Sequence, residues 1–364
     1  MNAVAAVRSV RVTHYCPWAA RKEPADSFLG GLSDAGIMER VARPDDAELV
    51  RMARLDRDWH AENVRSLAAI SADGLEFERM DVVGATGMRD LVGSGAPRRA
   101  ADGTEDWFVV TGQHPQALGS LAAPLFRALT RAGYRILYYA FDEASRTMPV
   151  CAAIAPFLTV LIHDEAPLSE AVCRALPRGC RTIHRSWVAN LTPFQAPFVD
   201  APERRILFLG SKLGMTPHRS RQIAHLSRHF SDRFVAISDH SVSVADQRGS
   251  LRYSAAFCPE GRKFTTPSMA ATHTDRPFWS GCLGMIPVSE DSKTGGRLES
   301  LHRSGLIIRY PWADLAALTS ACEHALEADT ASRRAVYDHF NREETVGAVI
   351  AAAIAATPPE ADAR

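Results

Sequence analysis

The chain has 364 residues, of which 46% are hydrophobic and 23% are charged, a balance typical of soluble globular proteins. Its 42 lysines and arginines equal its 42 aspartates and glutamates, which argues against a general polyanion-binding protein. Because so long a chain exceeds one ordinary hydrophobic core, we expect two domains.

The cysteines and the apolar runs of the sequence indicate in which cellular compartment the protein works. The seven cysteines are scattered and form no C-x-x-C pair, which predicts neither a zinc site nor a disulfide framework. Reduced thiols in the cytoplasm are the simplest interpretation. No apolar run reaches the ~20 residues that a membrane span needs, although peripheral contact with a membrane stays open.

The first half of the chain alternates short apolar runs with longer helical patterns, which is typical of a parallel α/β sheet. Predicted strands cover residues 7–15, 75–83, 107–112, 135–143, 158–165 and 181–187. Predicted helices cover residues 45–70 and 115–134. These elements predict an N-terminal Rossmann-like domain over residues 1–195, with a proline-rich linker at 190–205.

A second α/β pattern follows and predicts another Rossmann-like domain over residues 200–340, with a C-terminal helix and tail at 341–364. Its predicted strands cover residues 205–210, 233–238, 251–259, 285–290 and 306–310. Its predicted helices lie at about 219–230, after Asp314, and from about 333 to 356. Ligands of such sheets bind at the carboxyl ends of the strands, so two such domains would face a cleft.

Two short stretches of this second half suit an anion. Asp275 and Arg276 stand at a predicted helix start, where free backbone N–H groups beside a guanidinium would suit a diphosphate. Gly295 and Gly296 follow a predicted strand and would let the backbone approach a phosphate or sugar closely. Glu299 comes next and could accept hydrogen bonds from ribose hydroxyls. Taken singly, each residue also fits an ordinary cap, turn or exposed helix position.

A cation at the end of another predicted strand adds to this pattern. Lys263 follows Gly261 shortly after the strand at 251–259. A positive charge there would neutralise a diphosphate as it departs as a leaving group. A solvated basic turn is the alternative interpretation.

Residues 205–350 resemble the C-terminal donor domain of GT-B glycosyltransferases, including exostosin-like and retaining (group 1-like) members. Several segments carry the resemblance in the family's order: FLG (208–210), YSAAFCPEGRKF (253–264), DRPFWSGCLGMIPV (275–288), GGRLESL (295–301) and LIIRYPWADLAAL (306–318). Trp279 stands where those members usually carry Glu. The resemblance implies GT-B architecture, with two Rossmann-like domains facing a cleft.

The resemblance implies a glycosyltransferase that moves a sugar from a nucleotide-diphosphate sugar to an acceptor hydroxyl, in carbohydrate biosynthesis. Arg219, Arg276 and Lys263 would hold the diphosphate, while Glu299 and Glu260 would hold ribose or sugar hydroxyls. The acceptor would be a glycan, a lipid-linked molecule or a small molecule, and no nucleic acid is implied. Retention or inversion of the anomeric configuration, and the oligomeric state, stay open.

An inverting enzyme of this kind would need a general base in the first domain. His114, Asp142 and Asp164 follow predicted strands there and are the candidates. No metal or other cofactor is expected, because GT-B members generally neutralise the diphosphate with protein groups. His225 and His229 share a helix face, but no third ligand is evident for a zinc ion.

Two alternatives stay open. A nucleotide-sugar epimerase of the same fold would need the donor but no acceptor. A non-catalytic nucleotide- or carbohydrate-binding protein would bind the donor without turnover, and Trp279 in place of Glu leaves room for it.

Overall fold

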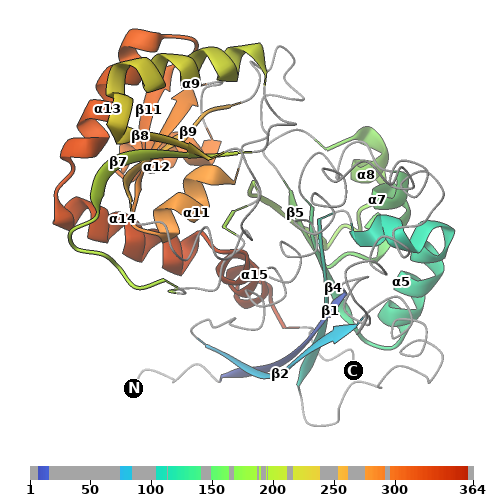
Figure 1. Ribbon diagram of the computed structural model, residues 1–364. Helices are drawn as coiled ribbons and strands as arrows, with labels where there is room; N and C mark the ends of the chain where they lie inside the picture. The colour runs from blue at the N-terminus through green and yellow to red at the C-terminus, as the bar shows by residue number, and fades with distance from the viewer. Residues whose placement is uncertain are drawn as a thin grey trace, which may run out of the picture. The chain divides into compact units, whose positions relative to one another are not determined.

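The computed structural model describes residues 7–15, 74–83, 104–112, 114–140, 149–163, 168–186, 188–189, 194, 196–210, 216–237, 253–260, 275–291 and 296–359 (Figure 1). These residues fall into two compact units. The first unit takes in the described residues up to Arg185 and those from Gly347 onward, and the second takes in Ser186 to Val346.

The described strands of the first unit form a six-stranded parallel sheet in the order β2-β1-β3-β4-β5-β6. The strands are β1 (Arg8–Tyr15), β2 (Leu75–Val83), β3 (Glu105–Thr111), β4 (Arg135–Tyr139), β5 (Val160–His163) and β6 (Arg181–His184). Every residue of β3 is buried, as expected for a central strand of a sheet covered on both faces. Each strand lies where the alternation of apolar runs predicts it.

The helices described in the first unit are η1 (His114–Leu121), α5 (Ala122–Arg131), α7 (Pro149–Ile154), η2 (Ala155–Phe157), α8 (Glu170–Ala175) and α15 (Val346–Ala355). The helix predicted over 115–134 begins as the 3-10 helix η1, which is kinked at Gly119 with φ 53°. The α-helix α5 follows and buries Leu125, Phe126 and Leu129. Phe126 meets Phe108 of β3 edge to face, with ring centroids 5.9 Å apart.

The single helix predicted from about 333 to 356 is wrong, because the structure divides this segment into α14 (Thr330–Glu343) and α15. Between them, Thr345 forms a parallel β-bridge with Ala189, and the Ala189 amide donates to the Glu344 carbonyl at 2.9 Å. These backbone bonds replace the helical ones and end α14. An apolar periodicity alone does not reveal such a break.

The described strands of the second unit form a five-stranded parallel sheet in the order β11-β10-β9-β7-β8. They are β7 (Glu203–Leu209), β8 (Phe234–Ile237), β9 (Tyr253–Cys258), β10 (Ile286–Asp291) and β11 (Ile308–Pro311). In chain order, β7 is the first strand of this sheet, β8 pairs on one side of it, and β9, β10 and β11 follow on its other side. The strand order therefore reverses between β7 and β9, and open α/β sheets bind ligands at the carboxyl ends of such a pair.

Helices α9 (Pro217–Phe230) and α13 (Leu315–Glu327) cover one face of this second sheet, and α11 (Arg276–Cys282) and α14 cover the other (Figure 1). The structure describes two further, short helices in this unit, η3 (Ser231–Arg233) and α12 (Gly296–Arg303). Side-chain caps fix the helix starts: Thr216 Oγ1 accepts from the Arg219 amide at 3.2 Å, and Asp314 Oδ1 from the Ala317 amide at 2.9 Å.

The predicted α/β class with two Rossmann-like sheets is thus confirmed. Within the described part of the chain, none of the helices combines the length and the apolar character needed to cross a membrane.

Candidate functional site

The switch point of the second sheet brings Arg276 to the carboxyl end of β7. Arg276 is the first residue of α11, and its Nε donates to the Leu209 carbonyl at 3.0 Å. Leu209 is the last residue of β7. The guanidinium also lies over the ring of Phe208, 5.9 Å from the centroid. A strand carbonyl and an aromatic face thus hold this cation at the edge where ligands bind.

Arg219 brings a second guanidinium to the same edge from the first turn of α9. Its side chain is buried, and its pKa is lowered from 12.5 to about 10, first by burial and then by the charge of Arg276. Glu260 and Glu290 act in the opposite direction. Because charges shift one another's pKa only over short distances, the two guanidinium groups and the two carboxylates lie near one another and form one cluster.

The end of β9 belongs to the same cluster. Glu260 lies two residues beyond Cys258, the last residue of β9, and is 1% exposed. The pKa of the Cys258 thiol is raised to about 12, mainly by burial, and responds to the charges of Arg276, Glu260 and Asp275. Sequence-predicted Arg219, Arg276, Glu260 and Asp275 therefore gather around the β7–β9 switch point.

Glu290, the penultimate residue of β10, is a fully buried carboxylate beside this cluster. Its Oε1 accepts hydrogen bonds from His218 Nε2 at 2.7 Å, Gln222 Nε2 at 2.8 Å and the Ala313 amide at 3.0 Å. Burial raises the pKa of Glu290, and these hydrogen bonds and His218 oppose that rise. One carboxylate thus ties the start of α9 to the loop after β11.

An aromatic stack lies next to that carboxylate. His218 and Trp312 stack with ring centroids 4.2 Å apart and planes 16° from parallel. The His218 side chain is 21% exposed, and Trp312 is partly exposed. Trp312 directly follows β11, so the stack also lies at the carboxyl edge of the sheet.

Glu299 lies on α12 and is engaged by arginines. Its Oε1 accepts from Arg303 Nε at 3.1 Å, and its Oε2 forms an ion pair with Arg309, which also pairs with Asp291. The hydrogen bond from Arg303 is the largest cause of its lowered pKa. Gly296 opens this helix with φ 77°, a backbone conformation that favours glycine.

Several predicted site residues lie outside the described residues: Gly261, Lys263, Gly295, Asp142 and Asp164. For His114 only the backbone, at the start of η1, is described. Trp279 is 3% exposed inside α11. This position, for which the resemblance suggested a Glu, is therefore part of the hydrophobic core here.

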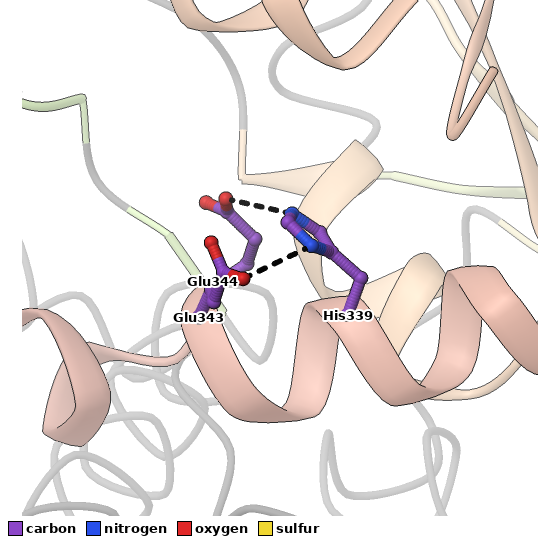
Figure 2. Close-up of side chains that lie close together, drawn as sticks. All are labelled: His339, Glu343 and Glu344. Carbon is purple, nitrogen blue, oxygen red and sulfur yellow. Dashed lines mark ion pairs between the residues drawn. The ribbon is translucent and has the colours of Figure 1, made fainter. Parts of the chain in front are cut away.

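A separate group of side chains of the kinds that bind metals lies at the end of α14. Figure 2 shows the ring of His339 facing the carboxylates of Glu343 and Glu344. His339 Nδ1 lies 3.3 Å from Glu343 Oε1, and His339 Nε2 lies 3.5 Å from Glu344 Oε1. Arg297 Nε donates to Glu344 Oε1 at 2.8 Å, and its Nη2 lies 3.7 Å from Glu343. Because a guanidinium already neutralises this pair of carboxylates, the arrangement fits an ion-pair network that fastens α12 to α14 better than a metal site.

Four residues of the site were not expected from the sequence: His218, Gln222, Glu290 and Trp312. Glu290 carried a usable signal, because it is a carboxylate at the end of a predicted apolar strand. Trp312 likewise lies two residues after a predicted strand. His218 and Gln222 gave no such signal, because their role depends on α9 crossing the sheet toward β10 and β11.

No protein-family model matches the sequence, and no curated protein matches it. Solved structures with similarity include AviGT4, a glycosyltransferase involved in avilamycin A biosynthesis, at 12% identity over 65% of this chain and 88% of that chain, with a TM-score of 0.35. Spinosyn rhamnosyltransferase SpnG complexed with thymidine diphosphate matches at 10% identity over 96% and 100% of the two chains, with a TM-score of 0.36.

The catalytic domain of starch synthase IV from Arabidopsis thaliana, bound to ADP and acarbose, matches at 11% identity over 96% of this chain and 98% of that chain, with a TM-score of 0.40.

Proposed function

We propose that the chain is a glycosyltransferase that moves a sugar from a nucleotide-diphosphate sugar to an acceptor hydroxyl, with the donor bound by the second unit. The observation that carries this proposal is the pair of guanidinium groups, Arg219 and Arg276, at the β7–β9 switch point. Their charges are close enough for Arg276 to lower the pKa of Arg219.

Electrostatics favours a diphosphate as the ligand of this pair. Arg276 lowers the pKa of Arg219, and Glu260 and Glu290 offset this in part, so the two guanidinium groups repel one another and a bound anion would relieve that repulsion. A diphosphate offers oxygens to both guanidinium groups, and charge-assisted hydrogen bonds of this type are the strong ones. The same groups would stabilise the charge that develops when the nucleoside diphosphate leaves.

The remaining site residues complete the proposal. Glu260 would accept hydrogen bonds from ribose or sugar hydroxyls beside Arg219. Glu299 would do so while sharing its carboxylate with Arg303 and Arg309. Lys263 would add charge at the diphosphate, and Gly261, Gly295 and Gly296 would allow close approach of the ligand.

On the acceptor side, His114, Asp142 and Asp164 remain the candidate bases, and no metal would be required because two guanidinium groups neutralise the diphosphate. The acceptor would be a glycan, a lipid-linked molecule or a small molecule.

The test is a thermal-shift panel of UDP, GDP, ADP, CDP and dTDP, each with Mg²⁺ or with a chelator. A nucleotide present at ~100 times its dissociation constant should stabilise the protein by about 2.7 kcal/mol. We expect at least one nucleotide to do so equally with chelator, and the corresponding nucleotide sugar to be consumed only when an acceptor is present.

Other results of this experiment would favour one of the two alternative functions. Conversion of the donor without an acceptor would favour an epimerase, and binding without turnover would favour a non-catalytic protein. Absence of any shift would overturn the donor site.

A further inference from the structure

We infer that the His218–Trp312 stack is the surface on which the base of the nucleoside diphosphate packs, and that Glu290 is the positioning residue that holds this stack in place. The inference rests on the proposed function, because it assigns one part of the same donor. Binding of the diphosphate and of the sugar hydroxyls does not explain the His218–Trp312 stack or its contacts with Glu290.

The stack lies along the sheet edge from the cation pair. His218 is the neighbour of Arg219 in the chain, and Trp312 follows the end of β11. Adjacent strands are about 4.8 Å apart, so the end of β11 is on the order of 10 Å from the end of β9 and roughly 14 Å from the end of β7, where Arg276 lies. A nucleotide whose diphosphate lies at Arg219 and Arg276 would therefore extend its nucleoside past β10 toward Trp312.

The stack is suited to a flat aromatic ligand. Its two rings are nearly parallel at 4.2 Å, and both are partly exposed to solvent. Nucleobases stack on aromatic side chains through their π faces, and this interaction tolerates every base. A stacking surface beside two guanidinium groups matches the two halves of a nucleoside diphosphate, the base and the charged phosphates.

Hydrogen bonds to Glu290 hold the two sides of the stack in place. Glu290 accepts hydrogen bonds from His218 on α9 and from the amide of Ala313, the neighbour of Trp312. Ala313 has φ 61°, a left-handed conformation that a residue with a Cβ keeps only when its surroundings hold it there. The same carboxylate therefore places both rings of the stack.

A purely stabilising role explains Glu290 less well. Its Oε2 is buried and has no hydrogen-bond partner among the described residues. A buried polar atom left in that state destabilises the fold, so its presence calls for another reason. Positioning a ligand surface supplies one.

The first experiment compares Trp312→Ala and Trp312→Phe with the wild-type protein by calorimetry, using UDP, GDP, ADP and inorganic pyrophosphate as ligands. We expect Trp312→Ala to weaken binding of the preferred nucleotide by about tenfold or more while pyrophosphate affinity changes less than about twofold. Trp312→Phe keeps an aromatic face and should retain most of the affinity. Nucleotide binding should also quench tryptophan fluorescence in the wild type, and Trp312→Phe should lose that component.

The second experiment uses Glu290→Gln and Glu290→Ala. Gln keeps an oxygen for His218 and Ala313, so it should retain nucleotide affinity, whereas Ala should lose it to about the extent of Trp312→Ala with pyrophosphate unaffected. Unchanged nucleotide affinity in Trp312→Ala, or equal losses for nucleotide and pyrophosphate, would overturn the inference alone. A wild-type protein that binds neither ligand would overturn the proposed function and the inference together.

Discussion

Arg276 Nε donates to the carbonyl of Leu209 at 3.0 Å, which fastens the first residue of α11 to the last residue of β7. This bond uses the Nε donor and fixes the plane of the guanidinium at the switch point. An arginine presents several donors in a rigid fork, whereas a lysine presents a single flexible point charge. The bond therefore orients the cation as well as placing it.

Replacing Arg276 should weaken diphosphate binding strongly. Hydrogen bonds to charged groups contribute about 1.5–3 kcal/mol, so Arg276→Gln should lose roughly 10- to 150-fold in affinity for nucleoside diphosphate and for pyrophosphate alike. Arg276→Lys should recover only part of it, because it keeps the charge and loses the fork. Calorimetry would measure both losses.

Arg228 offers a control, since it is an exposed arginine on α9 whose Nε bonds the Ala224 carbonyl. Arg228→Gln should leave diphosphate affinity unchanged. Equal effects of the two Gln variants would mean that net charge, and not the switch-point geometry, binds the ligand.

The close packing of α11 against α14 predicts a steric effect at Gly281. A Cβ added there would meet the ring of Phe340 at 2.4 Å, well inside contact distance. Gly281→Ala should lower the free energy of unfolding by about 1–3 kcal/mol, because an overpacked core must shift. Gly179, where an added Cβ meets nothing within 4 Å, provides the matched control. Chemical denaturation would show a clear loss for the first variant alone if the packing is as described.

Arg8 anchors the C-terminal helix α15 to the first sheet. Its Nη1 donates to the carbonyls of Ala355 and Thr357 at 3.2 and 2.9 Å, and its Nε and Nη2 bond both oxygens of Glu105 at 2.8 Å. Arg8→Ala removes these bonds and leaves the buried Glu105 less compensated, so it should cost about 1.5–3 kcal/mol of stability.

The expected signature of Arg8→Ala is faster hydrogen exchange in α15, because the carbonyls at the helix end lose their donor. Arg174→Ala breaks an exposed ion pair with Glu170 and should cost at most about 0.5 kcal/mol. Unchanged exchange in α15 would show that apolar packing alone holds the helix.

Glu290 predicts a pH dependence of stability with a definite sign. Its pKa is raised in the folded protein above the usual 4.5. The folded state therefore binds a proton more tightly than the unfolded state, and this contribution to stability is complete below pH 4.5 and is lost as pH rises through the folded pKa. Glu290→Gln has no such proton.

The difference in unfolding free energy between Glu290→Gln and the wild type should thus move in favour of the variant as pH rises above 4.5. Urea denaturation at a series of pH values would measure it. A difference that stays constant or moves the other way would contradict a raised pKa.

The sequence predicted the strands of both sheets well because parallel strands buried on both faces are short continuous apolar runs, as in RILFLG and WFVVT. It failed at Glu344 and Thr345, where bonds to Ala189, distant in sequence, end a helix that periodicity would continue. Tertiary pairing of this kind leaves no local pattern.

Some residues of the candidate site could likewise be expected from the sequence, whereas others depend on tertiary packing. The structure brings Arg219, Glu260 and Arg276 together, as expected from their places in the segments that resemble a GT-B donor domain, and their role in donor binding stays a prediction. The Glu290 network was not, because His218 and Gln222 reach Glu290 only through the path of α9 across the sheet. Glu299 was expected to be available for ribose, whereas its carboxylate also pairs with Arg303, four residues on in the same helix, and with Arg309 of β11. The second pairing depends on how α12 packs beside β11, which the sequence does not reveal.

Calorimetric titration of the wild-type protein with UDP, GDP, ADP, CDP and dTDP, repeated with Arg219→Gln and Arg276→Gln, tests the central claim most directly. The account predicts that at least one nucleotide binds with chelator present and that each variant loses most of that affinity. Binding that is indifferent to both variants, or no binding of any nucleotide, would contradict a diphosphate site at the β7–β9 switch point.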